Sequence, residues 1–324
     1  KKLSELAEMD KDAFVAMNTA FYQDGIFLHV PDGVQMEKPI QIIHLLLSEE
    51  SRLVQHRNLF LIGKNASAQV IICDHTLCPQ HFLTNSVTEV YAGENSDTDI
   101  LRLQNEHNNS GQVTNTWIRQ QAHSRCSHST ITLHGGVVRN NLRMQLHGEG
   151  AESEALGLYL TDKMQHVDNY TVIDHVAPHC TSNQYYKGVL DDASTGAFSG
   201  KIQVFPDAQK TEAFQTNNNI LLTDSARMNT KPRLEIYADD VKCSHGATVG
   251  QLDEDAMFYL QSRGIPRDES RLMLMDAFTY DVISRIKQTA LRERISDLVS
   301  QRLRGELSRC NSCALHCEDP DHAS

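Results

Sequence analysis

The sequence contains no run of about eighteen apolar residues, which excludes a hydrophobic membrane-spanning helix. Positive charge is also scarce, since 30 Lys and Arg residues stand against 42 Asp and Glu residues and give a formal net charge of −12. A chain with this balance is not suited to coating nucleic acid or an anionic membrane. The 324 residues are nevertheless 40% hydrophobic and 22% charged, a globular composition that excludes disorder for most of the chain.

Three sequence signals are missing as well. There is no Walker-type Gly-rich loop followed by Lys and Ser or Thr, so the chain is not itself an ATPase and we expect no nucleotide on it. The start, Lys1-Lys2-Leu3, has no initiator Met and no signal-peptide core behind it. The eight cysteines lack the regular density of a secreted disulfide scaffold, which favours reduced thiols. We therefore expect a trimmed form of a cytoplasmic protein, with an N-terminal region missing.

From about residue 26 to residue 237 the chain consists of short apolar runs of four to eight residues. The run Leu142-Arg143-Met144-Gln145-Leu146 alternates with period two, which predicts a strand with Leu142, Met144 and Leu146 facing the core. Clusters such as Asn108-Asn109-Ser110-Gly111 separate the runs and favour tight turns. The sequence therefore predicts more than two hundred residues of strand with no helical interruption.

Few architectures accommodate so many consecutive strands. Two sandwiches, a propeller and a β-solenoid are the candidates, and no motif recurs at a propeller-blade period. The turns favour a solenoid over paired sandwiches, with roughly 20–25 residues per coil. The run Asn217-Asn218-Asn219 suits a corner of such a coil.

The pattern changes after Gly250, where apolar residues begin to recur at helical spacing. Asp253 and Glu254 begin a helix that ends before Gly264, a second helix follows Pro266, and a third ends at Gly305. We therefore expect four parts. They are a remnant of an N-terminal helical region or linker (1–25), a β-helix core (26–250), a helical domain (251–305) and a Cys-rich tail (306–324).

Several long segments resemble a known family. They are residues 231–265, which include the run Asp239-Asp240-Val241-Lys242-Cys243-Ser244-His245, and residues 175–184, 186–190, 208–211 and 215–219. They resemble SufD, a component of the SUF iron–sulfur cluster assembly machinery, most strongly over about residues 170–285. The related SufB shares the Phe258-Tyr259-Leu260 and Arg263-Gly264-Ile265 stretches, but its segment lacks the Asp-Asp-Val-Lys-Cys-Ser-His run. That run favours SufD within the SufB/SufD family.

The resemblance implies a mainly β fold, with a right-handed parallel β-helix core followed by a small C-terminal helical domain. It also implies a non-catalytic assembly subunit that pairs with SufB and docks the ABC-type ATPase SufC on its C-terminal helices, to build and deliver nascent clusters. The residues themselves leave two other classes open: a β-helix carbohydrate-active enzyme, and a homodimeric metal-binding or redox protein.

Cys243 and His245 are the main candidate site. Thiolate and imidazole are both good ligands for iron and for iron–sulfur clusters. At positions i and i+2 of a strand they project from the same face, and two ligands need others from another chain or a bound thiol. The resemblance implies that these residues lie at the SufB interface and share a transient cluster or iron with it. We expect Leu234–His245 to take part in this interface, with SufB or in isolation with a second copy; participation of a flavin stays open.

Other residues are weaker candidates. Cys310, Cys313, Cys317 and His316, with His322 nearby, have spacings that suit a Zn or Fe–S site, although exposed reduced thiols in a tail would look the same. We expect His175, His179 and Cys180 to be structural, because Pro178 makes helical ligand spacing inapplicable. The acid pairs Asp191-Asp192 and Asp239-Asp240 are expected to be solvated rather than catalytic, since neighbours on a strand face opposite ways.

Overall fold

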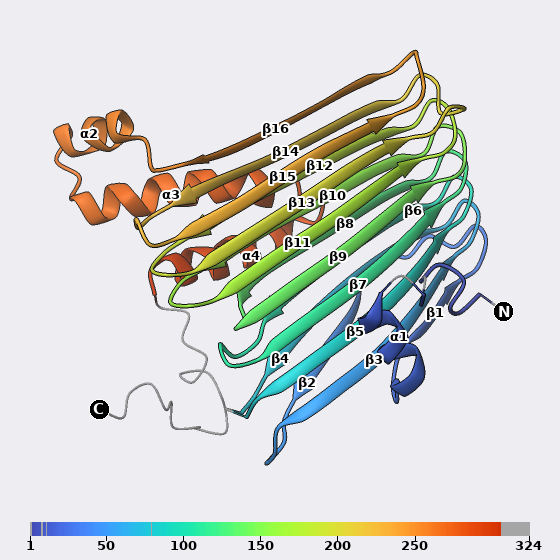
Figure 1. Cartoon of the computed structure of the whole chain (residues 1–324), viewed down its shortest axis with the longest axis horizontal. Coiled ribbons are helices and arrows are strands. Elements are labelled where there is room, and N and C mark those ends of the chain that lie inside the picture. Colours follow the sequence, from blue (N-terminus) through green and yellow to red (C-terminus); the bar gives the residue numbers. More distant parts are fainter. Residues whose placement is uncertain (1, 8, 11, 79, 306–324) are drawn as a thin grey trace.

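The computed structural model describes residues 2–305, apart from residues 8, 11 and 79. Its strands form two eight-stranded parallel sheets, one of odd-numbered strands (sheet A) and one of even-numbered strands (sheet B), stacked as the two walls of a flattened solenoid (Figure 1). This confirms the predicted β-solenoid. The strands are β1 (Phe27–Val30), β2 (Ile40–Leu46), β3 (Arg52–Ile62), β4 (Ser67–Thr76), β5 (Phe82–Ala92), β6 (Asp97–Asn105), β7 (Gly111–Gln120), β8 (Arg125–His134), β9 (Val137–Leu146), β10 (Glu152–Thr161), β11 (His166–His175), β12 (Thr181–Leu190), β13 (Thr195–Val204), β14 (Glu212–Leu221), β15 (Arg227–Ile236) and β16 (Lys242–Gly250).

The coils are longer than the sequence suggested. Glu152 of β10 lies opposite Thr181 of β12, 29 residues later, and Glu212 lies opposite Lys242, 30 residues later. The expected 20–25 residues per coil was therefore wrong. Two strands of about ten residues and two turns make one coil, because the strands continue through polar residues that the apolar runs did not include.

The interior of the solenoid is apolar along much of its length. Leu142, Met144 and Leu146 are at most 5% exposed and belong to the largest core cluster, as predicted. Asn217 and Asn219 also lie inside β14 and are buried, so the expectation of a coil corner there was wrong. Tyr159 explains their burial, because its hydroxyl donates to Asn219 Oδ1 at 2.5 Å and accepts from Asn217 Nδ2 at 3.2 Å.

A charged network fills the interior near the N-terminal end. The carboxylate of Asp74 accepts hydrogen bonds from Arg102 Nε at 2.7 Å and from Gln112 Nε2 at 2.8 Å, and its other oxygen lies 2.7 Å from His44 Nδ1. Burial alone would raise the pKa of Asp74, but Arg102 and His44 bring it below its usual value. The ring of His56 packs on that of His44, with 4.2 Å between centroids. In the sequence, no local pattern distinguishes the polar residues of this buried network from polar residues that face the solvent.

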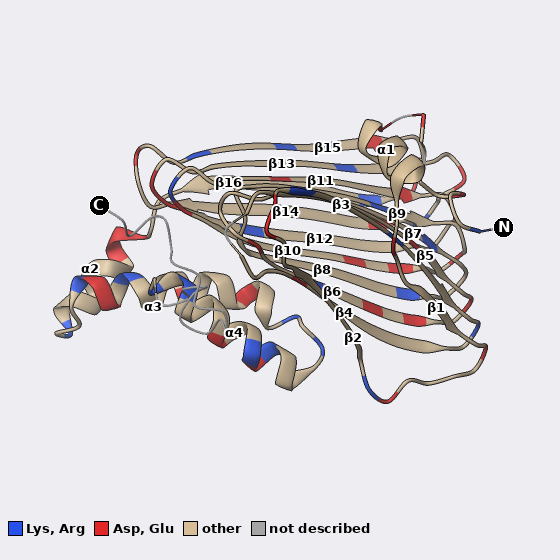
Figure 2. Ribbon diagram, turned by 90° about the horizontal axis from the view of Figure 1, so that it is seen from below, with Lys and Arg blue, Asp and Glu red and all other residues tan. Residues whose placement is uncertain are grey.

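Three C-terminal helices flank the solenoid: α2 (Glu254–Ser262), α3 (Arg267–Ile283) and α4 (Thr289–Leu303), close to where the sequence predicted them. Asp253 caps α2 by accepting from the amides of residues 255 and 256. α3 and α4 pack on the outer surface of sheet B (Figure 2), where Met275 and Ile295 join the leucines of β6, β8 and β10 in one cluster. Lys187 of β12 also connects sheet B to α3, through a 2.5 Å ion pair with Asp281.

The N-terminal segment covers the opposite wall. Helix α1 (Ala13–Phe21) packs against β3 and β5 of sheet A. The buried carboxylate of Glu89 accepts from the backbone amides of Ser4 at 2.7 Å and Leu6 at 2.8 Å, and forms a 2.9 Å ion pair with Arg57. One acidic side chain therefore fastens this segment to the sheet. In the part of the chain that the structure describes, no helix is long and apolar enough to cross a membrane.

The buried histidines predict a loss of stability in acid. Burial lowers the pKa values of His56 and His128 to about 3, against 6.5 for an exposed histidine. The unfolded chain therefore binds more protons than the native chain between about pH 6.5 and pH 3, so the stabilisation is complete above pH 6.5 and is lost as the pH falls. Urea unfolding should show a loss of about 2 kcal/mol per histidine between pH 7 and pH 5.

The variant His128→Gln should lose correspondingly less stability over this pH interval. The control is His179→Gln, whose side chain is 59% exposed and which should behave as the native chain does. An unchanged pH dependence in His128→Gln would contradict the assignment.

Candidate functional site

The solenoid ends in a coil made of β15 and β16, and neither strand has a neighbour on its outer side (Figure 1). These two edge strands are ten and nine residues long, whereas β1 and β2 at the other end have four and seven. Unpaired edges of this length are competent to accept strands from another chain. The candidate site lies on this C-terminal end.

The hydrogen-bonding groups of β16 alternate between its neighbour and the open side. The amide of Lys242 donates to the Thr211 carbonyl at 2.8 Å, so even-numbered residues of β16 face β14. The backbone groups of the odd-numbered residues face the free edge. This set contains no proline and comprises Cys243, His245, Ala247 and Val249.

Cys243 is half-buried at the start of β16. It lies opposite Ala213 and packs with Leu234 and Val241 in a small cluster at the end of the core. Burial raises the pKa of its thiol, partly offset by a backbone hydrogen bond from Ala213. The thiol is therefore protonated at neutral pH, and binding a metal must release its proton.

His245 lies on the same face of β16 as Cys243, two residues further along. It is exposed and stands opposite Gln215, which is 1% exposed and donates to Gln184 Oε1 at 3.0 Å. The expected i, i+2 geometry is thus present, and the imidazole extends the buried amide row to the open end. Among the described residues, no group of three or more His, Cys, Asp or Glu side chains is arranged to hold a metal ion.

Comparison with known proteins assigns the family. Residues 45–278 match the model described as SUF system FeS cluster assembly, SufBD core domain, and residues 1–42 match the SufBD protein N-terminal region. The chain belongs to the SufBD family. The resemblance to SufD read from residues 231–265 agrees with this assignment.

Relatives in this family carry the same description. A SufBD family protein of Synechocystis is 34% identical over 301 residues, which cover 90% of this chain and 66% of that protein. The iron–sulfur cluster assembly protein SufD of Escherichia coli is 31% identical over 298 residues, covering 91% and 70%, and that of Bacillus subtilis is 25% identical over 305 residues, covering 92% and 68%. The chain thus spans about two thirds of the length of these SufBD relatives.

The weaker candidate residues named from the sequence lie in different environments. Cys310, Cys313, His316 and Cys317 lie outside the described residues. His175 and Cys180 are fully buried, and His175 Nε2 lies 2.8 Å from Ser182 Oγ, in agreement with a structural role. His179 is in a turn, with its side chain exposed.

The acid pairs are in turns, where cations hold two of them. Asp191 lies 3.4 Å from Arg271, and Asp240 is paired with Lys210. Each ion pair offsets the charge of one acid beside a second carboxylate.

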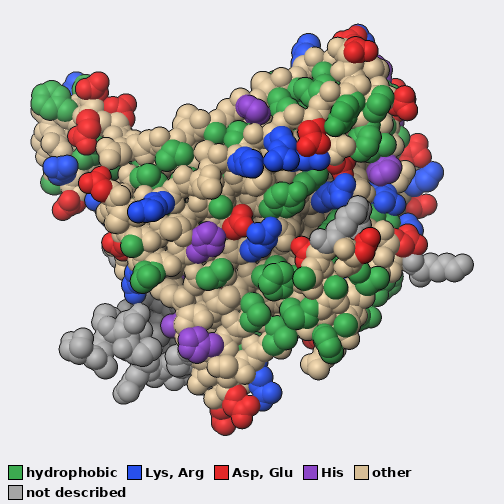
Figure 3. Space-filling model, in the orientation of Figure 1, with side chains coloured by type: hydrophobic (Ala, Val, Ile, Leu, Met, Phe, Trp, Pro, Cys, Tyr) green, Lys and Arg blue, Asp and Glu red, His purple; other side chains and the backbone are tan. Residues whose placement is uncertain are grey.

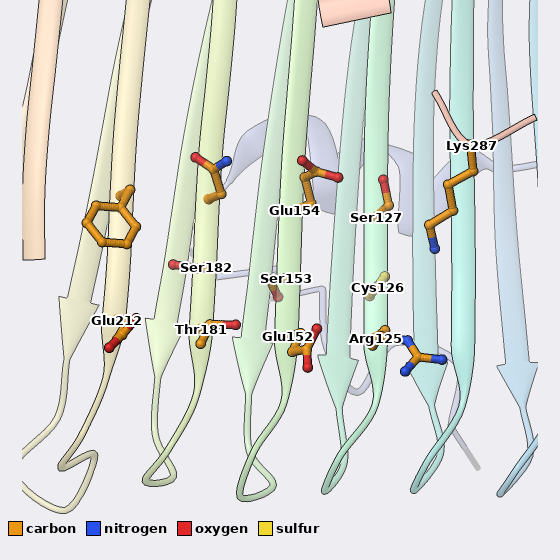
Figure 4. A pocket seen from close by; sticks show the side chains of 12 residues that line it. Arg125, Cys126, Ser127, Glu152, Ser153, Glu154, Thr181, Ser182, Glu212 and Lys287 are labelled. Atoms are coloured by element: carbon orange, nitrogen blue, oxygen red, sulfur yellow. The ribbon is translucent and has the colours of Figure 1, made fainter. Parts of the chain in front are cut away.

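A hollow of about 400 Å³ lies on the outer surface of sheet B, beside the loop between α3 and α4 (Figure 4). Glu152, Glu154 and Glu212 line it together with Lys287. Glu154 is 3.4 Å from Arg285, and Glu212 is 2.7 Å from Lys242, so two of the three carboxylates are held in ion pairs. The groove includes neither Cys243 nor His245 and gives no support to a carbohydrate-cleaving carboxylate pair.

The raised pKa of Cys243 predicts slow alkylation. Because only the thiolate reacts, iodoacetamide should label Cys243 slowly at pH 7, and the rate should keep rising above pH 9, where an unperturbed cysteine levels off. Peptide mass spectrometry distinguishes Cys243 from the other thiols. The control is Cys126, which is 3% exposed and should stay unlabelled while the chain is folded. Labelling of Cys243 at pH 7 as fast as in an unfolded peptide would contradict this view of the site.

Proposed function

We propose that the chain is a SufD-like, non-catalytic subunit that pairs with a SufB-like subunit through the C-terminal end of its solenoid. In this role it helps to build and deliver nascent iron–sulfur clusters. The observation that carries the proposal is the position of Cys243 and His245, side by side on an unpaired edge strand. Family membership supports the general role in SUF-system cluster assembly.

Ligand chemistry supports a site shared between two chains. Iron in a cluster takes thiolate and imidazole ligands, and Cys243 and His245 supply one of each. The cluster or iron is here the cargo, and the ligands that two side chains leave missing would come from the partner. An incoming strand would pair with the free amides of β16 and bring its own side chains alongside this face. Its approach would also bury His245.

The C-terminal helices offer a separate surface for a SufC-like ATPase. Phe258 and Tyr259 of α2 are 72% and 57% exposed, and Tyr280 of α3 is 50% exposed. Exposed aromatic side chains of this kind are typical anchors of protein interfaces. They lie on α2 and α3 and not on β16, so a partner bound to them would use a surface other than the free strand edge.

The first test of this function is complex formation. Mixing the chain with a SufB-like and a SufC-like subunit should give one complex, whose subunits comigrate on gel filtration. If β16 pairs with a second copy in the isolated chain, that chain should elute at the volume of a dimer. No complex with the SufB-like subunit, together with activity on a panel of polysaccharides, would overturn the proposal in favour of an enzyme.

The second test concerns the ligands. His245→Ala removes an exposed imidazole and leaves the core intact, so the complex should form normally but assemble much less cluster, measured as iron and acid-labile sulfide after reconstitution. Cys243→Ser tests the thiolate, and we expect a smaller loss. The combined variant Cys310→Ser, Cys313→Ser and Cys317→Ser is the control and should assemble as the native chain does. A His245→Ala complex with native iron content would remove the reason for placing the site here.

A further inference from the structure

The second edge of the open coil, β15, differs from β16 in its backbone. The amides of Arg227 and Tyr237 donate towards β13, to Ser194 and Val204, so the odd-numbered residues of β15 face its neighbour. The backbone groups of the even-numbered residues therefore face the free edge. Pro232 is one of them, and its missing N–H leaves a gap in the middle of that edge.

The outer surface of β15 is cationic, although the chain as a whole carries −12. Arg227, Lys231 and Arg233 project from this surface and are exposed, and Glu235 is its one acid. Glu235 is paired with Lys201 of β13 at 2.7 Å and lies 3.7 Å from Arg233, so one carboxylate is shared between two cations. Arg227 and Lys231 have no acidic partner within 4.0 Å among the described residues. Figure 3 shows Lys and Arg side chains gathered over this wall of the solenoid.

Lysine and proline on an edge strand are devices that prevent pairing with the wrong chain. In β15 they are adjacent, as Lys231-Pro232-Arg233, whereas β16 contains no proline and one lysine, Lys242, which is paired with Glu212 at 2.7 Å. The two edge strands of the last coil thus differ in their backbone donors and in their charge. The free edge of β16 keeps the backbone donor of each outward residue, whereas that of β15 lacks one donor and lies beside exposed cations.

We propose that the strand seated beside β15 belongs to the SufB-like partner and carries Asp or Glu on its outer face, opposite Lys231 and Arg233. This inference rests on the proposed function and adds the chemistry by which the partner is chosen. Opposite charges across neighbouring strands stabilise the pair, and like charges destabilise it. The cations therefore favour the acidic partner over other available edges.

A second copy of this chain is the occupant that the arrangement disfavours. Two β15 strands placed side by side about a two-fold axis would bring together two surfaces that each carry Arg227, Lys231 and Arg233 against one Glu235. Each copy would also contribute Pro232, so both strands would lack a donor. Charge and backbone therefore act in the same direction, towards a heterologous partner.

The test is the charge reversal Lys231→Glu with Arg233→Glu, measured as the Kd for the SufB-like subunit. Both side chains are exposed and neither fills the core, so the variant should fold, which a thermal melt checks. At low salt, about 50 mM, we expect the Kd to rise at least about ten-fold, and the difference should shrink at high salt as the charges are screened. Binding equal to that of the native chain would overturn the proposal.

Two matched variants define the result. Arg52→Glu with Lys64→Glu makes the same change in net charge at the opposite end of the solenoid, on side chains that are 59% and 62% exposed, and should bind as the native chain does. Lys231→Arg with Arg233→Lys keeps the charges and should also bind normally. Exchanging the partner's facing acids for Lys should restore binding to the reversed variant.

The outcomes separate this inference from the function on which it rests. If the native chain does not bind the SufB-like subunit, the proposed function fails. If the native chain and the reversed variant bind equally well, the function stands and the charge selection is wrong. Sedimentation showing that the native chain pairs with itself as tightly as with the SufB-like subunit would also overturn the selection.

Discussion

The parallel backbone ladder between successive coils is the interaction on which the rest of this structure depends. Each strand between the end coils hydrogen-bonds to the strand about thirty residues before it and to the one about thirty residues after it. Stacking in this register brings equivalent positions into rows along the solenoid. An inward residue of one coil is therefore covered by the equivalent residue of the next coil. The rows allow polar residues such as Gln215 and Asn217 to be buried, because other coils supply hydrogen-bond partners: Gln215 donates to Gln184, and Asn217 donates to the Tyr159 hydroxyl.

A ladder of this kind has no internal reason to stop, and its last coil is therefore chemically different from all the others. The inward side chains of β16 contact those of β14 on one side, and no further strand covers them on the other. Cys243 is therefore half-buried and His245 exposed, although both continue rows of buried residues. The same strand leaves its alternate amides unpaired. The accessibility of Cys243 and His245 and the unpaired edge of β16 thus arise from one cause, the end of the stack.

Side surfaces of the solenoid are used differently. The outer surface of sheet B has an apolar part, and α3 and α4 cover it. Sheet A is covered by α1 and the segment fastened to Glu89 at its N-terminal strands, and it carries a cationic surface at β15. A SufB-like partner at the end of the solenoid and an ATPase on the helices would therefore contact separate parts of the chain.

Local sequence determined the strands, the three C-terminal helices and the shared face of Cys243 and His245, because each depends only on periodicity or on spacing of a few residues. Residues 231–265 and the shorter segments upstream were also sufficient to indicate the family. Coil length, the burial of Asp74 with Arg102, and the half-buried state of Cys243 depend on residues about thirty positions away, so the tertiary structure alone decided them. The structural effect of Pro232 likewise depends on the tertiary structure. A proline is visible in the sequence, but only the register with β13 decides that its missing donor faces the open edge.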